Sequence, residues 1–410
     1  MPVLKLDQYE RLFFSSETLY CRSIGEAMGT PTTVLVVLFS ILLIQVLEFS
    51  YSIASHSNVR CIEIEEKGLV KFRENLTDES NRLSSKTCLG GGINPSLFNL
   101  KHLSHLDLSM DNFSGTQIPK FLGSLQNLSF DSTIPLWLSN IPGLLRLHLD
   151  DNRFQGPIPD TLGRLSSLTH IGLSDNSFNT SMPSSLGNLS SLVHLDLSVN
   201  EFQGSLQTTI KNLCRLRVLD LSKNSFSGEI PRAERGPFGC HKNLESLLLS
   251  SNSFHVPIHM SIGRLSRLRE LDVSKNLLNG SIPSILGQLS KLEMLDVSAN
   301  HLAGMVYEYH FTKLTKLNRL SMSFHFLALN VSSQWIPPFQ LQAIKLASYN
   351  LGPLFSSWPQ TQTHVILLFM SNASVSDTIP DWFENVYSRI PYLDLSMNRI
   401  SGKLPKFVAS

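Results

Sequence analysis

The chain has 410 residues, of which 42% are hydrophobic and 16% are charged, and its formal net charge at pH 7 is +1. This balance gives no electrostatic case for binding nucleic acid. The five cysteines can be interpreted only once a compartment is known, because disulfides persist in oxidising environments.

An apolar run near the amino terminus predicts entry into the secretory pathway. Residues 34–47 read VLVVLFSILLIQVL, which is short for a membrane span and suits the core of a signal peptide. Met28 offers a start just before the run, and small residues at Ser52 and Ala54 follow it. We expect an upstream extension over 1–27 and a signal peptide over 28–54, with a retained signal anchor as the alternative.

Residues 55–90 are expected to form a degenerate N-terminal cap. Ile62, Leu69, Phe72 and Leu76 fall near helical spacing, which predicts a short amphipathic helix. A stacked array exposes an apolar cross-section at its end, so a covering element is expected there.

From residue 91 onward, the phrase leucine-x-leucine-x-x-asparagine recurs, and five of its six intervals are 24 residues long while the sixth is 28. The phrase ends at Asn152, Asn176, Asn200, Asn224, Asn252, Asn276 and Asn300. This period and this phrase are the signature of leucine-rich repeats. We therefore expect an α/β solenoid over 91–410, a right-handed curved array of about twelve coils with a parallel β-sheet on its concave face.

Each part of one coil has a predicted role. Leu195 and Leu197 alternate as in a short strand, and the amide of Asn200 can satisfy backbone groups where the chain turns. Isoleucine-proline pairs such as Ile282-Pro283 recur later in the coil, where proline excludes a continuing helix. The convex side is therefore expected to be extended or to form short 3₁₀ turns.

The repeat is irregular at three places. Asp111 takes the asparagine position, and only 41 residues separate it from Asn152, so we expect that a local deletion removed one strand near residues 129–132. A four-residue insertion near Cys240 explains the 28-residue interval. Other residues replace the asparagine at His325, Tyr349 and Ala373 before Asn398 restores it. The sequence then stops within a coil, which predicts an array open at its C-terminal end.

Two cysteines occupy nearly the same phase of adjacent coils. Cys214 lies ten residues before Asn224, and Cys240 lies twelve before Asn252. Adjacent strands are about 4.8 Å apart, which falls within the Cα range of a disulfide. We predict that Cys214 and Cys240 pair, with two buried thiols as the alternative.

Three phrases carry a family resemblance: GGINPSLFNLKHLSHLDLS at 91–109, GSIPSILGQL at 280–289 and WIPPFQLQAIKLASYNLGP at 335–353. They resemble the plant-type 24-residue repeats of receptor-like proteins that perceive microbial elicitors, a group with fungal xylanase receptors and leaf-mould and scab resistance proteins. The resemblance implies a type I membrane glycoprotein outside the plasma membrane that signals through a receptor kinase co-receptor. It also suggests that Cys61, and less clearly Cys88, are cap cysteines and further disulfide candidates.

The chain departs from that family pattern in its cap, which lacks a paired-cysteine segment after Lys86, and in ending before the later repeats, the island and the membrane span. We expect a truncated, non-catalytic ectodomain that binds a protein or cell-wall elicitor. An ectodomain fragment of a receptor kinase and a secreted inhibitor of pectin-degrading enzymes are the alternatives. Membrane contact is expected only through the N-terminal segment or the missing span.

The exposed strand positions are the candidate ligand surface, because strand residues alternate between the two faces of a sheet. Repeated Asp-Leu-Ser and Asp-Val-Ser phrases indicate scaffold, so the varied residues are the better candidates. These are Arg146, His148, Asp150, Asp151, His170, Asp175, His194, Lys223, Glu270 and Lys275. The histidines are expected to gain charge in a weakly acidic cell wall. A solvated surface without a ligand is the alternative.

Glycosylation is predicted where N-x-S/T sequons occur in a secreted chain. They lie at Asn75, Asn112, Asn127, Asn179, Asn188, Asn279, Asn330 and Asn372. Motifs for catalysis are missing: Gly90-Gly91-Gly92 lacks the lysine of a phosphate loop, and there is no zinc motif or serine elbow. We expect no enzyme activity, no cofactor and no metal.

Overall fold

The computed structural model describes residues 104–107, 109, 133–206, 209–232, 242–388 and 390–403, which all belong to one compact unit, Ile62–Ser410. The predictions for 1–27, 28–54 and 55–90 lie outside the described residues. So do Cys61, Cys88 and Cys240, together with the sequons at Asn75, Asn112 and Asn127.

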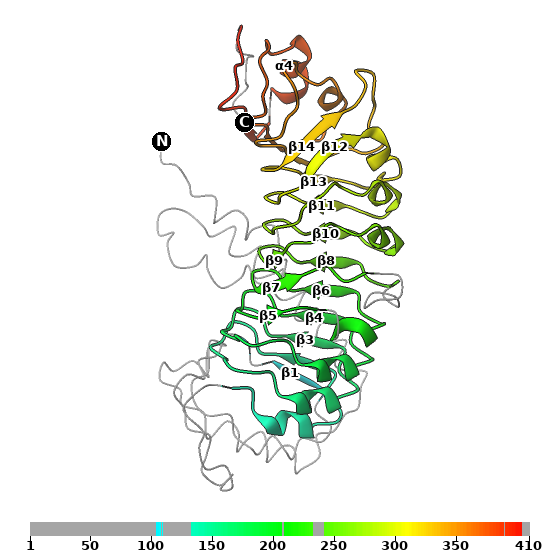
Figure 1. The fold of residues 1–410 in the computed structure, drawn as a ribbon, viewed down its shortest axis with the longest axis vertical. Coiled ribbons are helices and arrows are strands. Elements are labelled where there is room, and N and C mark those ends of the chain that lie inside the picture. The colour runs from blue at the N-terminus through cyan, green and yellow to red at the C-terminus, as the bar shows by residue number, and fades with distance from the viewer. Residues whose placement is uncertain are drawn as a thin grey trace, which may run out of the picture. The chain divides into compact units, whose positions relative to one another are not determined.

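A parallel sheet of twelve strands runs through the described part, one strand for each coil (Figure 1). Its strands, in order, are β1 (His105–Asp107), β2 (Arg146–His148), β3 (His170–Gly172), β4 (His194–Asp196), β6 (Val218–Asp220), β8 (Ser246–Leu248), β10 (Glu270–Asp272), β11 (Met294–Asp296), β13 (Arg319–Ser321), β15 (Ala343–Lys345), β16 (Leu367–Phe369) and β17 (Tyr392–Asp394). The predicted solenoid is confirmed, and the twelve strands match the twelve asparagine positions of the repeat from Asp111 to Asn398, counting those that hold another residue.

Smaller sheets form after the turns that end β4, β6, β8, β11 and β13. They are β5 (Gln203–Gly204), β7 (Ser225–Gly228) and β9 (Ser253–Phe254), and then β12 (Ala303–Tyr307) with β14 (Phe326–Asn330). Their pairing is also parallel, as stacking of successive coils requires.

Short helices return the chain toward the sheet, as the proline pattern predicts. They are η4 (Leu136–Asn140), η5 (Asp160–Arg164), η6 (Ser184–Asn188), η7 (Ile210–Asn212), η8 (Met260–Arg264), η9 (Ser284–Gln288), η10 (Glu308–Phe311), η11 (Trp358–Thr361) and one α-helix, α4 (Asp381–Tyr387). Pro159, Pro183 and Pro283 stand directly before three of them with φ between −61° and −69°, the value that the proline ring fixes.

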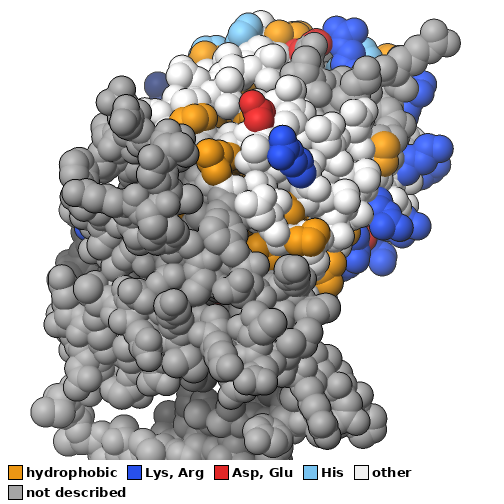
Figure 2. Space-filling view, turned by 90° about the horizontal axis from the view of Figure 1, so that it is seen from below, with side chains coloured by type: hydrophobic (Ala, Val, Ile, Leu, Met, Phe, Trp, Pro, Cys, Tyr) orange, Lys and Arg blue, Asp and Glu red, His pale blue; other side chains and the backbone are white. Residues whose placement is uncertain are grey.

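Surface charge is unevenly distributed over the described part. In the space-filling view of Figure 2, Lys and Arg side chains gather along one side, at the right of the view, while the neighbouring surface is mostly uncharged. The near-zero net charge of the chain therefore conceals a local excess of positive charge.

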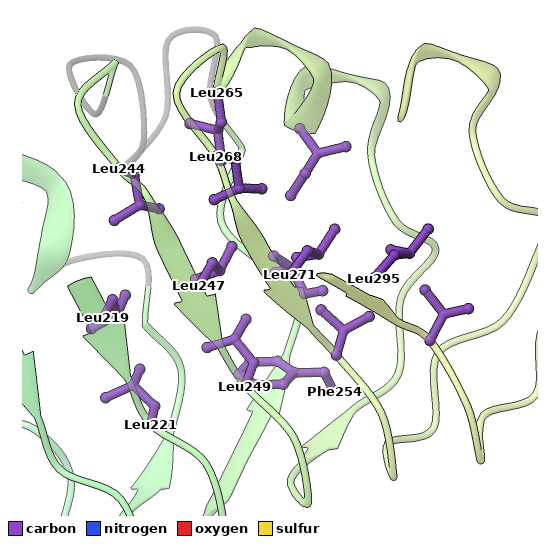
Figure 3. Packing of buried hydrophobic residues seen from close by; sticks show 14 of the residues in the cluster. Leu219, Leu221, Leu244, Leu247, Leu249, Phe254, Leu265, Leu268, Leu271 and Leu295 are labelled. Carbon is purple, nitrogen blue, oxygen red and sulfur yellow. The ribbon is translucent and has the colours of Figure 1, made fainter. Parts of the chain in front are cut away.

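The core is a stack of identical layers. Leu192, Leu195 and Leu197 are fully buried, and equivalent leucines recur in the other coils (Figure 3). Phe178 and Phe202 stack with ring centroids 5.5 Å apart. One coil alone would leave these side chains half uncovered, so each layer is stable only against its neighbours.

The asparagine ladder accounts for the backbone groups at the turn. Asn200 donates to the carbonyls of Leu173 at 2.9 Å, Leu197 at 3.2 Å and Ser198 at 3.0 Å, and its Oδ1 accepts the amide of Phe178 at 3.1 Å. One side chain thus serves both its own coil and the preceding one. The residue before it, Val199, has φ of 54°, a left-handed conformation that recurs at this position in the other coils.

The sheet continues across the irregular places. His105 pairs with Arg146, so one step of the sheet spans 41 residues, as the missing leucine-x-leucine phrase predicts. Val218 pairs with Ser246 across the 28-residue interval without a change of register. Where Ala373 replaces the ladder residue, Asn398 of the next coil accepts the amides of both Ala373 and Val375.

Candidate ligand-binding face

Five predicted residues lie together on β2, β3 and β4 and the turn that follows β2. Arg146 pairs in register with His170, and His170 with His194, so these three side chains form one row across the sheet. The rings of His170 and His194 stack with centroids 5.8 Å apart. His148 and Asp150 form the adjacent positions of the first of these coils. We call Arg146, His148, Asp150, His170 and His194 the histidine patch.

The other predicted residues do not join this patch. Asp151, Asp175, Lys223 and Lys275 are exposed at the left-handed positions where the strand turns, one in each of four coils. Glu270 lies on β10, three strands beyond β4, and accepts a hydrogen bond from the hydroxyl of Ser246. The ten candidates therefore extend along the face and do not form one cluster.

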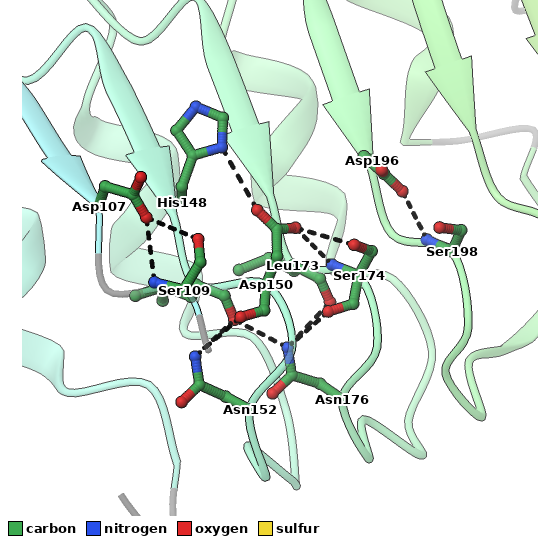
Figure 4. Close-up of polar contacts among 11 residues, drawn as sticks. Asp107, Ser109, His148, Asp150, Asn152, Leu173, Ser174, Asn176, Asp196 and Ser198 are labelled. Atoms are coloured by element: carbon green, nitrogen blue, oxygen red, sulfur yellow. Dashed lines mark hydrogen bonds and ion pairs between the residues drawn. The ribbon is translucent and has the colours of Figure 1, made fainter. Parts of the chain in front are cut away.

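Asp150 links two coils of the scaffold (Figure 4). Its Oδ1 accepts the amide of Ser174 at 2.8 Å and the hydroxyl of Ser174 at 3.0 Å, and its Oδ2 lies 3.3 Å from Nδ1 of His148. In the next coil the corresponding amide, that of Ser198, is held by Asp196 of the same coil at 2.9 Å. Asp150 thus replaces an aspartate that the Ser174 coil lacks.

Gly172 stands where that missing aspartate would be. A Cβ added at Gly172 would meet both carboxylate oxygens of Asp150 well inside van der Waals contact. The glycine therefore makes room for a carboxylate from the preceding coil. The sequence identified Asp150 as a candidate but not its contact with Gly172, because the two positions are 22 residues apart and only the register makes them neighbours.

Substitutions at Gly172 and Asp150, made singly and together, test this link. We expect Gly172→Asp to lower the free energy of unfolding by about 1–3 kcal/mol through crowding, and Asp150→Ser by about 1 kcal/mol because the Ser174 amide loses its acceptor. The double variant recreates the Asp-Leu-Ser arrangement of Asp196, so it should recover most of the loss. Urea denaturation of the four proteins gives the coupling energy, and purely additive losses would refute the link.

The three histidines differ in their titration. The hydrogen bond to Asp150 raises the pKa of His148 and outweighs the opposing effect of burial. Burial, reinforced by the nearby charges of Arg146 and His194, lowers the pKa of His170 to about 4, and burial also lowers the pKa of His194. The expectation that all three gain charge in a weakly acidic medium is wrong for His170, and the lowered pKa of His194 opposes it there. Of the three, only His148 has a pKa shifted in the direction that favours the charged form.

The repeated aspartates belong to the scaffold, as the sequence indicates. Asp196, Asp220 and Asp296 each accept the amide of the serine two residues later at 2.9 Å. Burial raises the pKa of Asp220 to about 7, with repulsion from Asp196, its neighbour in register, as the next cause. Burial together with Asp272 raises the pKa of Asp296 to about 6. Sequence reasoning missed these shifts, although adjacent Asp-Leu-Ser phrases signal them.

Cys214 is disulfide-bonded, and its partner lies outside the described residues, so pairing with Cys240 stays a prediction. All five described sequon asparagines are exposed: Asn179, Asn188, Asn279, Asn330 and Asn372. Their glycosylation also stays a prediction. Within the described ranges, no helix is both long enough and apolar enough to cross a membrane, and no group of three potential ligands gathers to hold a metal ion.

A family model described as a leucine-rich repeat region matches residues 83–328, more than half of the chain. The chain belongs to the leucine-rich repeat family. It is similar to two tomato (Solanum lycopersicum) proteins, with 46% identity over 107 residues to Receptor-like protein EIX2 and 45% over 105 residues to Receptor-like protein EIX1. Each match covers 26% of this chain and only 10% of the relative. The predicted resemblance to plant receptor-like proteins is confirmed.

Solved structures agree on the fold. The plant peptide hormone receptor RGFR1, in complex with RGF2, superimposes with a TM-score of 0.60 at 24% identity, over 77% of this chain and 55% of that one. The receptor kinase GASSHO1/SCHENGEN3 of Arabidopsis thaliana, in complex with CASPARIAN STRIP INTEGRITY FACTOR 2, gives 0.52 at 26% identity, over 77% and 41%. Both are plant receptors, and the second structure is a leucine-rich repeat ectodomain.

Proposed function

We propose that this chain is the ligand-recognition part of a plant cell-surface receptor-like protein in defence or signalling. It is non-catalytic and binds a protein or peptide elicitor on the concave face of its sheet. The observation that carries the proposal is the histidine patch. In three successive coils, Arg146, His170 and His194 present a row of large polar side chains on a rigid sheet, and loops or faces held by a scaffold commonly carry recognition.

The relatives support this role. Two of them are receptor-like proteins by name, and the Arabidopsis receptor kinase that shares the fold was solved with a factor bound. By analogy we infer a secreted or cell-surface location and signalling through a receptor kinase partner. That kinase structure also favours a second candidate, the ectodomain of a receptor kinase. Sequencing the transcript beyond codon 410 separates the two, since only the second encodes a kinase.

A binding experiment tests the proposed face. The full chain is expressed in a secretory host. Purified fungal xylanase, the elicitor class suggested by the resemblance, is assayed for binding to it, and binders are selected on it from phage-displayed random peptides. Binders should lose about tenfold or more in affinity for His170→Ala/His194→Ala, because truncation removes the centre of the surface. The matched control, His255→Ala/His301→Ala, changes two exposed histidines outside the twelve-stranded sheet and should bind normally. Equal losses in both variants would refute the assignment to this face.

A further inference from the structure

One flank of the array is strongly basic. It consists of the described segments that directly precede β6, β8, β10, β11 and β13, namely residues 212–217, 242–245, 264–269, 288–293 and 312–318. Nine exposed cations lie on these segments: Arg215, Arg217, Lys242, Arg264, Arg267, Arg269, Lys291, Lys313 and Lys316. The only acidic residues on them are Glu245 and Glu293. We call this surface the basic flank.

Both carboxylates of the basic flank are already paired. Arg217 binds Glu245 through two hydrogen bonds of 3.0 and 2.8 Å, and Arg269 binds Glu293 at 3.1 and 2.7 Å. These four side chains directly precede β6, β8, β10 and β11 and form a row of alternating charge across the N-terminal ends of these strands. Arg215, Arg267, Lys291 and Lys316 therefore have no acidic residue of the flank segments left to neutralise them.

Four of the remaining cations share one position of the repeat. Arg215, Arg267, Lys291 and Lys316 each come three residues before a strand, and in the coil of β8 the same position holds Asn243. Because the strands are in register and about 4.8 Å apart, Arg267, Lys291 and Lys316 follow one another at steps of one strand, and Arg215 lies two strands from Arg267. The structure gives no ion pair for these four within the described ranges.

The chemistry around this row discriminates between kinds of polyanion. None of the flank's residues is aromatic, so it offers no ring on which a nucleic-acid base could stack. Its leucines are buried, so it offers no large apolar side chain for insertion into a lipid surface. An exposed hydroxyl residue directly precedes three of the four cations, at Ser266, Ser290 and Thr315. Hydroxyls beside cations suit a ligand that carries both sugar hydroxyls and carboxylates.

We propose that the basic flank binds a linear acidic polysaccharide of the polyuronate class, in which each sugar unit carries one carboxylate. The chain of sugars lies along the row of Arg215, Arg267, Lys291 and Lys316. None of the predicted sequon asparagines falls on these segments, and Asn188 occupies the equivalent position one coil earlier. This site is separate from the histidine patch and does not depend on what the concave face binds.

The test compares two variants with the same change of net charge. In the flank variant, Arg215, Arg267, Lys291 and Lys316 are replaced by glutamine. In the control, four exposed cations outside the flank are replaced in the same way: Arg153, Arg232, Arg399 and Lys403. Each cation near an anionic surface contributes roughly fivefold to affinity, so the loss of four should weaken the binding of polygalacturonate by the flank variant roughly 600-fold. The control should lose less than about tenfold.

Three further measurements on the unsubstituted chain keep the proposal falsifiable if a variant fails to fold. Raising NaCl from about 50 mM to about 200 mM should weaken polygalacturonate binding by at least about tenfold, as for other polyanions. Fully methyl-esterified pectin, which carries no charge, should not bind. Duplex DNA and phosphatidylserine vesicles should bind more weakly than polygalacturonate. Equal loss in both variants, binding of the esterified pectin, or tighter binding of DNA or vesicles would overturn the proposal.

Discussion

Replacing Asn200 with alanine is expected to lower the free energy of unfolding by about 2–4 kcal/mol, the largest effect of any single substitution considered. The substitution leaves the amide of Phe178 without its acceptor. It also removes one of the two side-chain donors to the carbonyls of Leu173 and Leu197, which Asn176 and Asn224 still serve. An unsatisfied amide where water has little access costs about 1–3 kcal/mol, and the lost hydrogen bonds to the carbonyls add about 1 kcal/mol. Equilibrium denaturation of the secreted chain measures the loss.

A matched control for Asn200→Ala is Asn350→Ala. Asn350 is exposed, and its side chain forms one hydrogen bond, in which Oδ1 accepts the amide of Gly352 at 3.2 Å. Its replacement should change the free energy of unfolding by less than about 0.5 kcal/mol. If the two variants were equally stable, the ladder would be incidental to the fold. Because repeat arrays gain stability from neighbouring coils, hydrogen exchange should show the loss concentrated around Phe178 and Asn200.

The ladder also shows why so much of this fold is predictable from sequence. Leu195, Leu197 and Asn200 are related by a short spacing within one coil, and the period repeats that relation until the stack is fixed. Strand positions, the 3₁₀ turns after proline and the twelve coils follow from this local pattern. Predicting these features requires no contact between distant residues to be known, except that each coil stacks on the one before it.

The candidate site is less predictable, because its properties arise between coils. Sequence identified His170 and His194 as exposed and titratable, yet burial and the nearby charges of Arg146 and His194 lower the pKa of His170 to about 4. It identified Asp150 as a binding residue, whereas the carboxylate holds the amide of Ser174 in the next coil. The basic flank was hidden for a similar reason, since its cations are separated by about one repeat in the sequence and meet only in the stack.

The same stacking predicts an unusual pH dependence of stability. The pKa of Asp220 is about 7 in the folded chain, because burial and the charge of Asp196 disfavour its ionised form, whereas an unfolded aspartate ionises near pH 4. Between these two values the folded state holds a proton that the unfolded state has released. The free energy of unfolding therefore falls as pH rises from about 4 to about 7. Asp296, with a pKa of about 6, acts in the same direction.

Asp220→Asn should remove most of this dependence. The amide oxygen of asparagine can still accept the Ser222 amide, which lies 2.9 Å from Oδ1 of Asp220, but it carries no charge to repel Asp196. We expect the variant to be more stable than the parent by about 1–2 kcal/mol near pH 7.5 and nearly equal to it near pH 4.5, after allowance for solvent screening. Urea denaturation at the two pH values measures the difference.

Asp394→Asn provides a control with the same local sequence and the opposite sign. Burial pushes the pKa of Asp394 upward, but hydrogen bonds from Ser396 outweigh it, and the net pKa lies below the usual value. Its ionised form therefore stabilises the fold at neutral pH, and this stabilisation is lost as pH falls through the lowered pKa. Near pH 7.5, Asp394→Asn should destabilise the chain where Asp220→Asn stabilises it. Two changes of the same sign would contradict an origin in burial and in the neighbouring charge of Asp196.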